Sequence, residues 1–304
     1  MMMEYMQIRQ DQINIVISSN MIVMKSIKTI LTAIILLFFS NSIQSQYLKR
    51  SLQDAKDFKC GISSPSAHYK AILGEGDENS GIIKGLSRYG NLIVDPGGKS
   101  NKVSYENEEI VLFVLEGAGN LYFNKKAIPV STNDFIYVPA RTSFGFTNPR
   151  EQALSLIIMG FPLTVDTCRI KNIVMLANTS EVKFQTLPSH GPTTTFQLLL
   201  GTYESTRDRL AAACRVTSLF IMDFASGGTN NPHRHKDEEE VYLVLRGSGD
   251  IVAGEKDDKS ELRHPATEGD IYFYSPKTLI GFYSGNSPEE EHARILAVRF
   301  KYPF

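Results

Sequence analysis

The sequence has almost no excess of charge of either sign. Its 304 residues include 32 Lys and Arg against 33 Asp and Glu, which leaves a formal net charge of −1. A protein that holds nucleic acid through its phosphates presents a surplus of basic side chains. The composition therefore argues against a nucleic-acid partner.

Cysteine is scarce, with Cys60, Cys168 and Cys214 as the three examples. Their spacing matches neither a zinc motif nor the dense disulfide framework of small secreted domains, so both classes are excluded. An exported protein with three cysteines can form one disulfide and leave one thiol. The spacing alone predicts no particular pairing.

Apolar runs of membrane-spanning length are also missing. The run at 30–39 is shorter than the about 20 residues that a bilayer-spanning helix needs. Lys25 and Lys28 precede it and small polar residues follow, which is the layout of a secretory signal peptide with cleavage near Ser45. We predict that 1–45 is an upstream extension and signal peptide, and that the mature protein is secreted or periplasmic without a stable membrane span. The alternative is an N-terminal anchor that stays attached.

The remaining chain is rich in short β-type runs. Apolar residues make up 42% of the sequence and charged residues 21%, a balance typical of a soluble protein with a real core. Runs such as EIVLFVLEG and EVYLVLRG alternate with Gly, Pro, Asn and Asp. Their β-branched and aromatic content favours strands over short helices. Many short strands in succession predict an all-β sandwich or barrel.

The strand pattern occurs twice. Residues 97–117, GGKSNKVSYENEEIVLFVLEG, align without a gap with 227–247, GGTNNPHRHKDEEEVYLVLRG. Farther along, NDFIYVPARTSFGF resembles GDIYFYSPKTLIGF. Two copies of one unit indicate two equivalent small barrels in tandem. We place the N-terminal barrel at 46–165 and the C-terminal barrel at 166–304, with a linker around 162–190.

The second copy contains the residue types that bind metals. Along an extended strand alternate side chains face the same side, so His233 and His235 should both point inward. A turn at KDEE then allows Glu240 to face the same cavity. Two neutral imidazoles and one carboxylate form a facial set suited to Fe(II), Mn(II), Ni(II) or Zn(II). In the alternative, the histidines are solvated or hydrogen-bond the glutamate without a metal.

The spacing of this cluster resembles the first motif of the cupin superfamily. The pattern G-x5-H-x-H-x4-E-x6-G is formed by Gly227, His233, His235, Glu240 and Gly247. A following Gly-Asp, strand, Pro, Gly-Phe segment is similar to part of the second motif. The resemblance covers roughly 90–160 and 215–300, and it implies a bicupin: tandem double-stranded β-helix (jelly-roll) barrels, with a metal motif only in the C-terminal one.

The second copy departs from the family pattern at one place. Where the second motif has a histidine, this chain has Ile280. The site then keeps three protein ligands or takes a fourth from elsewhere, with His264 and His292 as candidates by composition. Family spacing also tolerates Glu239 in place of Glu240, although the interval to the last glycine favours Glu240.

The first copy departs further. Its four equivalent positions hold side chains that offer no imidazole or carboxylate: Val103, Tyr105, Ile110 and Phe144. We expect this barrel to bind no metal there and to be filled with apolar volume instead. It would act as the structural half of an internal pseudo-dimer and cover sheet edges. A metal-free pocket for an apolar ligand is the alternative.

Further residues are expected around the second site. Tyr242, two residues after the glutamate, should face the cavity, where its phenol acts as hydrogen-bond donor, acid or base, or else its ring is part of the core. Arg207 and Arg209 are candidates for clamping a carboxylate, although arginines in such charge runs are usually solvated. Met222 and Phe224 are expected to wall the pocket.

The resemblance implies several functions and does not choose among them. A facial set with open positions suits a metal-dependent, dioxygenase-like enzyme acting on a small organic acid or phenolic compound. The alternatives are a metal-assisted lyase or isomerase of sugar-type acids, and a non-catalytic small-molecule binding protein, because a fold alone supplies no activity. The metal (Fe, Mn, Ni or Zn) and the pairing of subunits into a homodimer stay open.

Overall fold

The structure is a computed structural model that describes residues 47–163, 173–257, 260–285 and 292–301. The predicted upstream extension and signal peptide, residues 1–45, lie outside this part of the chain. Within it, no helix has the length and apolar character that crossing a membrane requires. Two short 3₁₀ helices are its only helical segments and the other regular elements are strands, so the predicted all-β fold is confirmed.

The N-terminal half forms two sheets. The larger has the strand order β11-β8-β5-β10-β4-β3-β2 and the smaller the order β7-β6-β9. The strands are β2 (Lys56–Asp57), β3 (Ala67–Gly74), β4 (Arg88–Val94), β5 (Glu108–Glu116), β6 (Ala118–Phe123), β7 (Lys126–Ser131), β8 (Asp134–Val138), β9 (Phe144–Thr147), β10 (Leu154–Pro162) and β11 (Met175–Asn178). Two antiparallel sheets around one core are the arrangement of a jelly roll.

The C-terminal half repeats this plan. Its larger sheet has the order β1-β19-β16-β21-β14-β12-β13 and its smaller sheet the order β15-β20-β17-β18. The strands are β1 (Tyr47–Ser51), β12 (Thr194–Thr202), β13 (Leu210–Ala213), β14 (Val216–Phe224), β15 (Thr229–His233), β16 (Glu238–Arg246), β17 (Ser248–Asp257), β18 (Ser260–Thr267), β19 (Asp270–Tyr274), β20 (Ile280–Ser284) and β21 (Arg294–Lys301). Between β11 and β12 lie the 3₁₀ helices η1 (Thr179–Glu181) and η2 (Pro188–His190).

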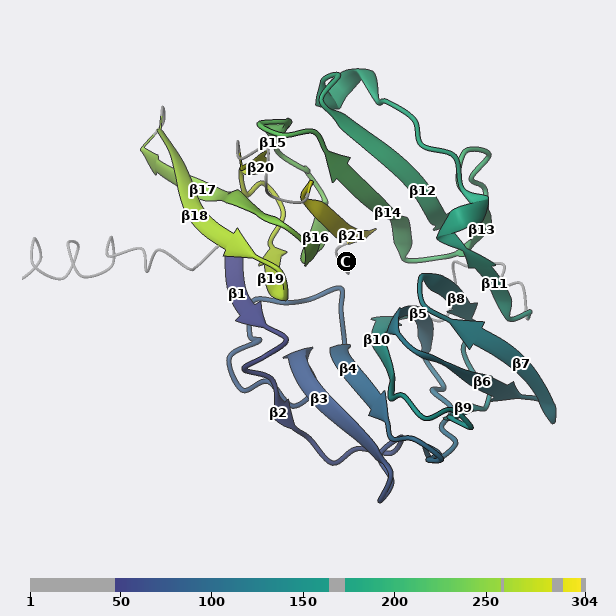
Figure 1. The fold of residues 1–304 in the computed structure, drawn as a ribbon. Helices are drawn as coiled ribbons and strands as arrows, with labels where there is room; N and C mark the ends of the chain where they lie inside the picture. The colour runs from purple at the N-terminus through teal and green to yellow at the C-terminus, as the bar shows by residue number, and fades with distance from the viewer. Residues whose placement is uncertain (1–46, 164–172, 258–259, 286–291, 302–304) are drawn as a thin grey trace, which may run out of the picture. The chain divides into compact units, whose positions relative to one another are not determined.

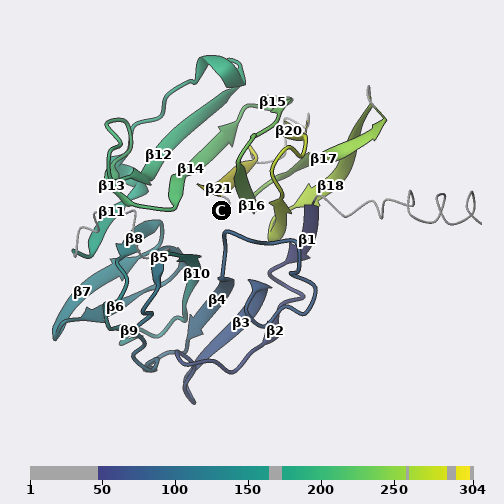
Figure 2. The same cartoon turned by 180° about the vertical axis from the view of Figure 1, so that it is seen from behind.

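The halves exchange strands at their edges. The first described strand, β1, pairs antiparallel with β19 of the C-terminal sheet, with Tyr47 opposite Tyr274. In return β11, which follows the N-terminal barrel, pairs with β8, with Met175 opposite Tyr137. Figures 1 and 2 show the purple β1 among the yellow-green strands of the other half. Each exchange covers a sheet edge that would otherwise be open. The predicted boundary between residues 165 and 166 lies outside the described residues.

Three apolar clusters form the core. One joins the halves, and within it the ring of Phe161 on β10 lies 5.0 Å from that of Phe300 on β21. The other two fill the barrels separately. In the N-terminal barrel, Ile110 and Phe144 are buried and Val103 packs against the same cluster. Apolar side chains therefore occupy the positions that correspond to His233 and Glu240 of the second copy.

The cysteines divide between a disulfide and a thiol. Cys214 takes part in a disulfide bond whose other half lies outside the described residues, while Cys60 is a free thiol. This is the division that three cysteines in an exported protein allow.

Candidate functional site

A small cavity in the C-terminal barrel contains the ligand-type residues. Its volume is about 40 Å³, room for about three water molecules. Polar and apolar side chains both line it: Leu187, His190, Phe196, Leu198, Arg207, Ser218, Phe220, Asn230, His233, His235, Glu240, Tyr242 and Arg299. All three predicted metal-binding residues and Tyr242 thus lie around one space.

The strands β15 and β16 bring the two histidines and the glutamate together. A register shift on β15 between Asn230 and His233 precedes the turn that carries His235. Glu240 lies near the start of β16, opposite Arg299 on one neighbouring strand and Tyr274 on the other. A central strand of a large sheet holds the carboxylate rigidly, whereas the imidazoles come from a strand end and a turn.

The reactive atoms of these three side chains lie close together. His235 Nε2 is 3.1 Å from His233 Nε2 and 3.0 Å from Glu240 Oε2. Glu240 Oε2 is buried and, within the described chain, receives no hydrogen bond despite that short distance. The side chains as they stand form no group of three or more His, Cys, Asp or Glu able to hold a metal ion among the described residues. The observed geometry is thus two close contacts that share His235 Nε2.

The protonation of His233 follows from its surroundings. Its Nδ1 lies 2.9 Å from the carbonyl oxygen of Asn231, which can only accept, so Nδ1 carries the proton and donates. Nε2 then presents its lone pair toward His235. Burial lowers the pKa of the His233 imidazole, which favours the neutral ring. A neutral ring with a free Nε2 is the form that binds a metal.

The structure distinguishes the two neighbouring glutamates. Glu239 faces away from the cavity, where its carboxylate accepts hydrogen bonds from the backbone N–H of Lys84 at 2.9 Å and of Gly85 at 2.6 Å. Gly85 permits this approach because a Cβ there would lie 3.0 Å from Glu239 Oε2. Burial raises the pKa of Glu239 to about 7. Glu240 is therefore the glutamate of the cavity.

The equivalent glutamate of the first copy makes the reciprocal contact. Glu109 on β5 is fully buried and accepts from the backbone N–H of Cys214 at 2.8 Å, Arg215 at 2.7 Å and Val216 at 3.1 Å. Burial raises its pKa as well. Each half thus inserts one buried glutamate into the backbone of the other, and we call Glu109 and Glu239 the glutamate clamps.

The third imidazole of the cavity is one that the sequence did not indicate. His264 packs against the rings of Tyr47 and Tyr272 and His292 is exposed, so neither candidate lines the cavity. His190 does, with its ring centroid 5.0 Å from that of His233. It lies in the segment QTLPSHGPTTT, whose turn-type composition predicts a linker and gives no sign of where it docks.

Tyr242 lines the cavity with its hydroxyl engaged. The side chain is buried, and Asn230 Nδ2 donates to Tyr242 Oη at 3.2 Å. Burial raises the pKa of the phenol well above 10. Tyr242 therefore stays protonated near neutral pH, which suits a hydrogen-bond donor and not a general base. Its catalytic role remains a prediction.

The two arginines that were predicted to clamp a carboxylate lie in different places. Arg207 lines the cavity and donates from Nη2 to Ser218 Oγ at 3.3 Å. Arg209 instead forms an ion pair with Glu181 at the exposed surface. A second arginine that the sequence did not indicate, Arg299 on β21, also lines the cavity. The cavity thus has two guanidinium groups on its wall.

The expectation that Met222 and Phe224 wall the pocket is wrong. Both are buried in the core of the C-terminal barrel, and Phe224 packs on Phe282 with ring centroids 4.7 Å apart. They share a strand face with Ser218 and Phe220, which do line the cavity. The cavity occupies the other end of that face, and Met222 reaches it only through Asn230.

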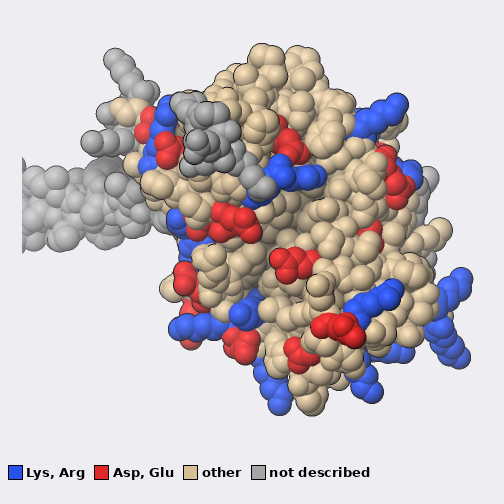
Figure 3. Space-filling view, in the orientation of Figure 1, with Lys and Arg blue, Asp and Glu red and all other residues tan. Residues whose placement is uncertain are grey.

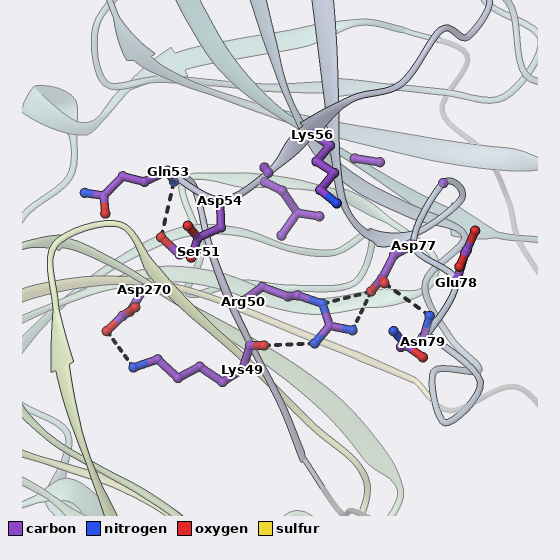
Figure 4. A pocket seen from close by; sticks show the side chains of 14 residues that line it. Lys49, Arg50, Ser51, Gln53, Asp54, Lys56, Asp77, Glu78, Asn79 and Asp270 are labelled. Atoms are coloured by element: carbon purple, nitrogen blue, oxygen red, sulfur yellow. Dashed lines mark hydrogen bonds and ion pairs between the residues drawn. The ribbon is translucent and has the colours of Figure 1, made fainter.

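A larger groove in the structure lacks comparable chemistry. It measures about 750 Å³ and is open to solvent. Figure 4 shows two ion pairs among its charged side chains, Lys49 with Asp270 and Arg50 with Asp77. On the face shown in Figure 3, basic and acidic side chains are interspersed. This groove therefore offers surface ion pairs and no buried reactive group.

Family models match both halves of the chain. A model described as Cupin domain matches residues 90–160, and one described as Cupin matches residues 206–298. No curated protein matches the chain. The two matched ranges correspond to the two copies of the internal repeat.

Solved structures share the fold at low sequence identity. A protein described as glyoxylate-induced, from Pseudomonas aeruginosa, has a TM-score of 0.67 at 15% identity, covering 86% of this chain and 90% of its own. A bacterial pirin from Escherichia coli in complex with nickel(II) has a TM-score of 0.61 at 12% identity, covering 85% and 100%. A variant of oxalate decarboxylase from Bacillus subtilis has a TM-score of 0.59 at 11% identity, covering 84% and 77%. At these identities the likeness shows the fold alone.

Proposed function

The chain is a tandem member of the cupin superfamily, a bicupin, and we propose that its C-terminal barrel binds one divalent transition metal (Fe, Mn, Ni or Zn). With this metal, the barrel would act as a metal-dependent, dioxygenase-like enzyme on a small organic acid. His233, His235 and Glu240 would hold the metal. The observation that carries the proposal concerns the buried oxygen Glu240 Oε2. This oxygen lies 3.0 Å from an imidazole nitrogen and yet receives no hydrogen bond from the described residues.

The donor atoms have the chemistry of metal ligands, and two of their contacts have a suitable spacing. Two ligand atoms bonded at about 2.1 Å and at right angles around a metal lie about 3 Å apart. The two close contacts of His235 Nε2, at 3.1 Å and 3.0 Å, match that spacing. A buried carboxylate oxygen without a partner costs roughly 1–3 kcal/mol, and more when the group is charged. A cation among these atoms would remove that cost.

The remaining wall of the cavity supports an acid as substrate. A bound metal supplies Lewis acidity and open coordination positions. Arg207 and Arg299, whose Nε atoms face acidic side chains at 3.4 Å and 3.2 Å, would bind the substrate carboxylate through their other N–H groups, since guanidinium groups match carboxylates in charge and geometry. The protonated Tyr242 would donate a hydrogen bond, and Phe196 and Phe220 would exclude water from the other side. The arginine pair favours an organic acid over a phenolic compound.

The fold neighbours are consistent with this proposal by analogy. One is a pirin in complex with nickel(II), and another is an oxalate decarboxylase, named for a small dicarboxylic acid. Their likeness shows the fold alone, so the proposal depends on the residues of the cavity.

Metal-loading experiments test the enzyme proposal. Protein stripped of metal is loaded with Fe(II), Mn(II), Ni(II) or Zn(II) in turn and incubated with short mono- and dicarboxylic acids, sugar acids and simple phenols. We expect oxygen consumption with an acid and one of the redox-active metals. Turnover without oxygen consumption would indicate the lyase or isomerase alternative. Binding of acids without turnover under any metal would indicate a binding protein and contradict the proposed enzyme.

We also propose export, from the signal-type segment in 1–45. Intact mass and N-terminal sequencing of the protein recovered from its native cell should give a mature chain that begins near Ser45. A chain that still contains the apolar run 30–39 would contradict cleavage and favour the retained anchor.

A further inference from the structure

We propose that His190 is a fourth protein ligand of the same metal, supplied by the segment that connects the two barrels. This inference rests on the proposed function, because it requires a metal at His233, His235 and Glu240. His190 lies on η2, ahead of the range 206–298 that the family model matches. The family pattern therefore does not supply this histidine, and the proposal is specific to the chain.

The position of the His190 ring resembles that of the two other histidines. Its centroid lies 5.0 Å from that of His233, with an interplanar angle of 74°. The rings of His233 and His235 are related in nearly the same way, at 4.8 Å and 87°. Three imidazoles in edge-to-face succession thus border one cavity, in which Glu240 supplies the carboxylate.

A buried amide fixes which nitrogen of His190 is free. His190 Nδ1 lies 2.6 Å from Asn230 Oδ1. The other end of that amide, Nδ2, lies 3.5 Å from Met222 Sδ and 3.2 Å from Tyr242 Oη. A thioether only accepts hydrogen bonds, so the NH₂ group belongs on the Met222 side and the amide oxygen faces His190.

This orientation gives His190 the tautomer of a metal ligand. Because Asn230 Oδ1 can only accept, His190 Nδ1 carries the proton and donates it. Nε2 is then the unprotonated nitrogen. Metal-binding histidines commonly donate their second N–H to an amide, carboxylate or carbonyl in this manner, which fixes the ring and its tautomer. Asn230 is 1% exposed, so it is a built-in partner and not a surface contact.

The remaining neighbours explain why a histidine is needed from outside the motif. Ile280, at the place of the second-motif histidine, pairs directly with His233 and is buried. Its side chain offers no donor to a metal. η2 lies against β15, and Gly191, with φ +82°, ends it in a conformation that favours glycine. The chain thus turns sharply after His190, and the ring stays packed on Phe196 at 5.0 Å.

Metal affinity of a matched pair of variants tests the proposal. His190→Phe keeps an aromatic ring on Phe196 and removes both nitrogens, whereas His264→Phe makes the same change at a histidine outside the cavity. Affinities for Mn(II), Zn(II) and Co(II) are measured by competition with a chelator, and the visible spectrum of the Co(II) form reports coordination number. We expect His190→Phe to weaken binding by about 10- to 100-fold or more and to change the Co(II) spectrum. His264→Phe should match the wild type.

A measurement on the unaltered protein covers the case in which His190→Phe does not fold. Pulsed EPR of the Mn(II)-loaded wild type, or X-ray absorption of the Zn(II) form, counts coordinated imidazoles. We expect three. A count of two, or an unchanged Co(II) spectrum and affinity in a folded His190→Phe, would overturn the role of His190.

The two proposals fail in distinguishable ways. If His233→Ala and Glu240→Ala lose the metal while His190→Phe retains it, the metal site stands and His190 only packs. If neither His233→Ala nor Glu240→Ala changes bound metal, the proposed site is wrong and this inference is wrong with it.

Discussion

The two barrels share a frame and differ in their interiors. Both central strands, β5 and β16, begin at the same point of the repeat, and both carry a buried glutamate clamp at the second residue, Glu109 and Glu239. At the very next residue the copies diverge, with Ile110 in one and Glu240 in the other. A single step along a strand moves from the face that joins the halves to the face that lines the barrel. The interface therefore constrains one face of each strand, and the interior is free to become core or cavity.

The largest expected effect comes from removing what only the second barrel has. His233→Ala should reduce bound metal to near background, because it removes one imidazole of the proposed motif set and leaves a cavity in its place. Val103→Ala, the equivalent change in the first barrel, should leave the metal content unchanged. Elemental analysis of both variants, purified without a chelating tag, checks this. Equal metal content in His233→Ala and the wild type would show that the assigned site is wrong.

The next effect concerns what the barrels share. Glu109→Ala leaves the buried backbone N–H groups of Cys214, Arg215 and Val216 without their acceptor and should lower the free energy of unfolding by roughly 1–3 kcal/mol per unsatisfied site. Glu239→Ala leaves two such N–H groups without their acceptor and should lower the free energy of unfolding by a smaller amount. Urea denaturation of both variants gives the comparison. An unchanged midpoint in Glu109→Ala would show that the clamps contribute no stability.

The clamps also predict a pH dependence. Burial raises the folded-state pKa of Glu239 to about 7, above its ordinary value of 4.5, so the folded protein binds the proton more tightly than the unfolded chain. The contribution of this group to stability is full below pH 4.5 and is lost as the pH rises toward 7. Glu109 acts in the same direction.

Glu239→Gln should therefore reduce the loss of stability that accompanies a rise in pH. Its melting temperature, measured from pH 4.5 to 8, should fall less steeply than that of the wild type, and Glu109→Gln serves as the reciprocal case. A slope identical to the wild type in both variants would mean that these carboxyls titrate normally.

The smallest expected effect is a change in metal affinity on substitution at position 280. Ile280→His adds an imidazole directly opposite His233. In the wild-type background we expect a modest gain in metal affinity, because His190 already supplies the fourth ligand. In the His190→Phe background the gain should be larger, about 10-fold or more. Chelator competition on the two backgrounds gives the result. An equal or weaker affinity in both would show that position 280 faces away from the metal.

The sequence predicted what repeats and what alternates. The gapless repeat located two barrels, because equal spacing of strands and turns requires equal folds. The parity of side chains along a strand placed His233, His235, Glu240 and Tyr242 around one cavity. Parity also grouped Met222 and Phe224 with the residues of the cavity face. It does not say where along that face the cavity ends, so those two residues were placed wrongly.

Other features depend on tertiary contacts that no local pattern encodes. His190 reaches the cavity because a turn-rich segment docks on β15, and docking depends on the partner surface rather than on periodicity. Arg207 and Arg209 are two residues apart in one loop, yet one lines the cavity and the other pairs with Glu181. The pairing of β1 with β19 joins residues more than two hundred positions apart. The sequence of a short strand does not by itself predict the strand with which it pairs.

The reciprocal exchange of β1 and β11 makes each barrel incomplete without the other. If either half were expressed alone, β8 or β19 would lose an outer neighbour, and its unpaired N–H and C=O groups would attract strands from other molecules. Such fragments should aggregate or reassemble with their complement instead of folding singly. Nicking the connecting segment would, by the same logic, leave two polypeptides that stay interlocked and melt as one.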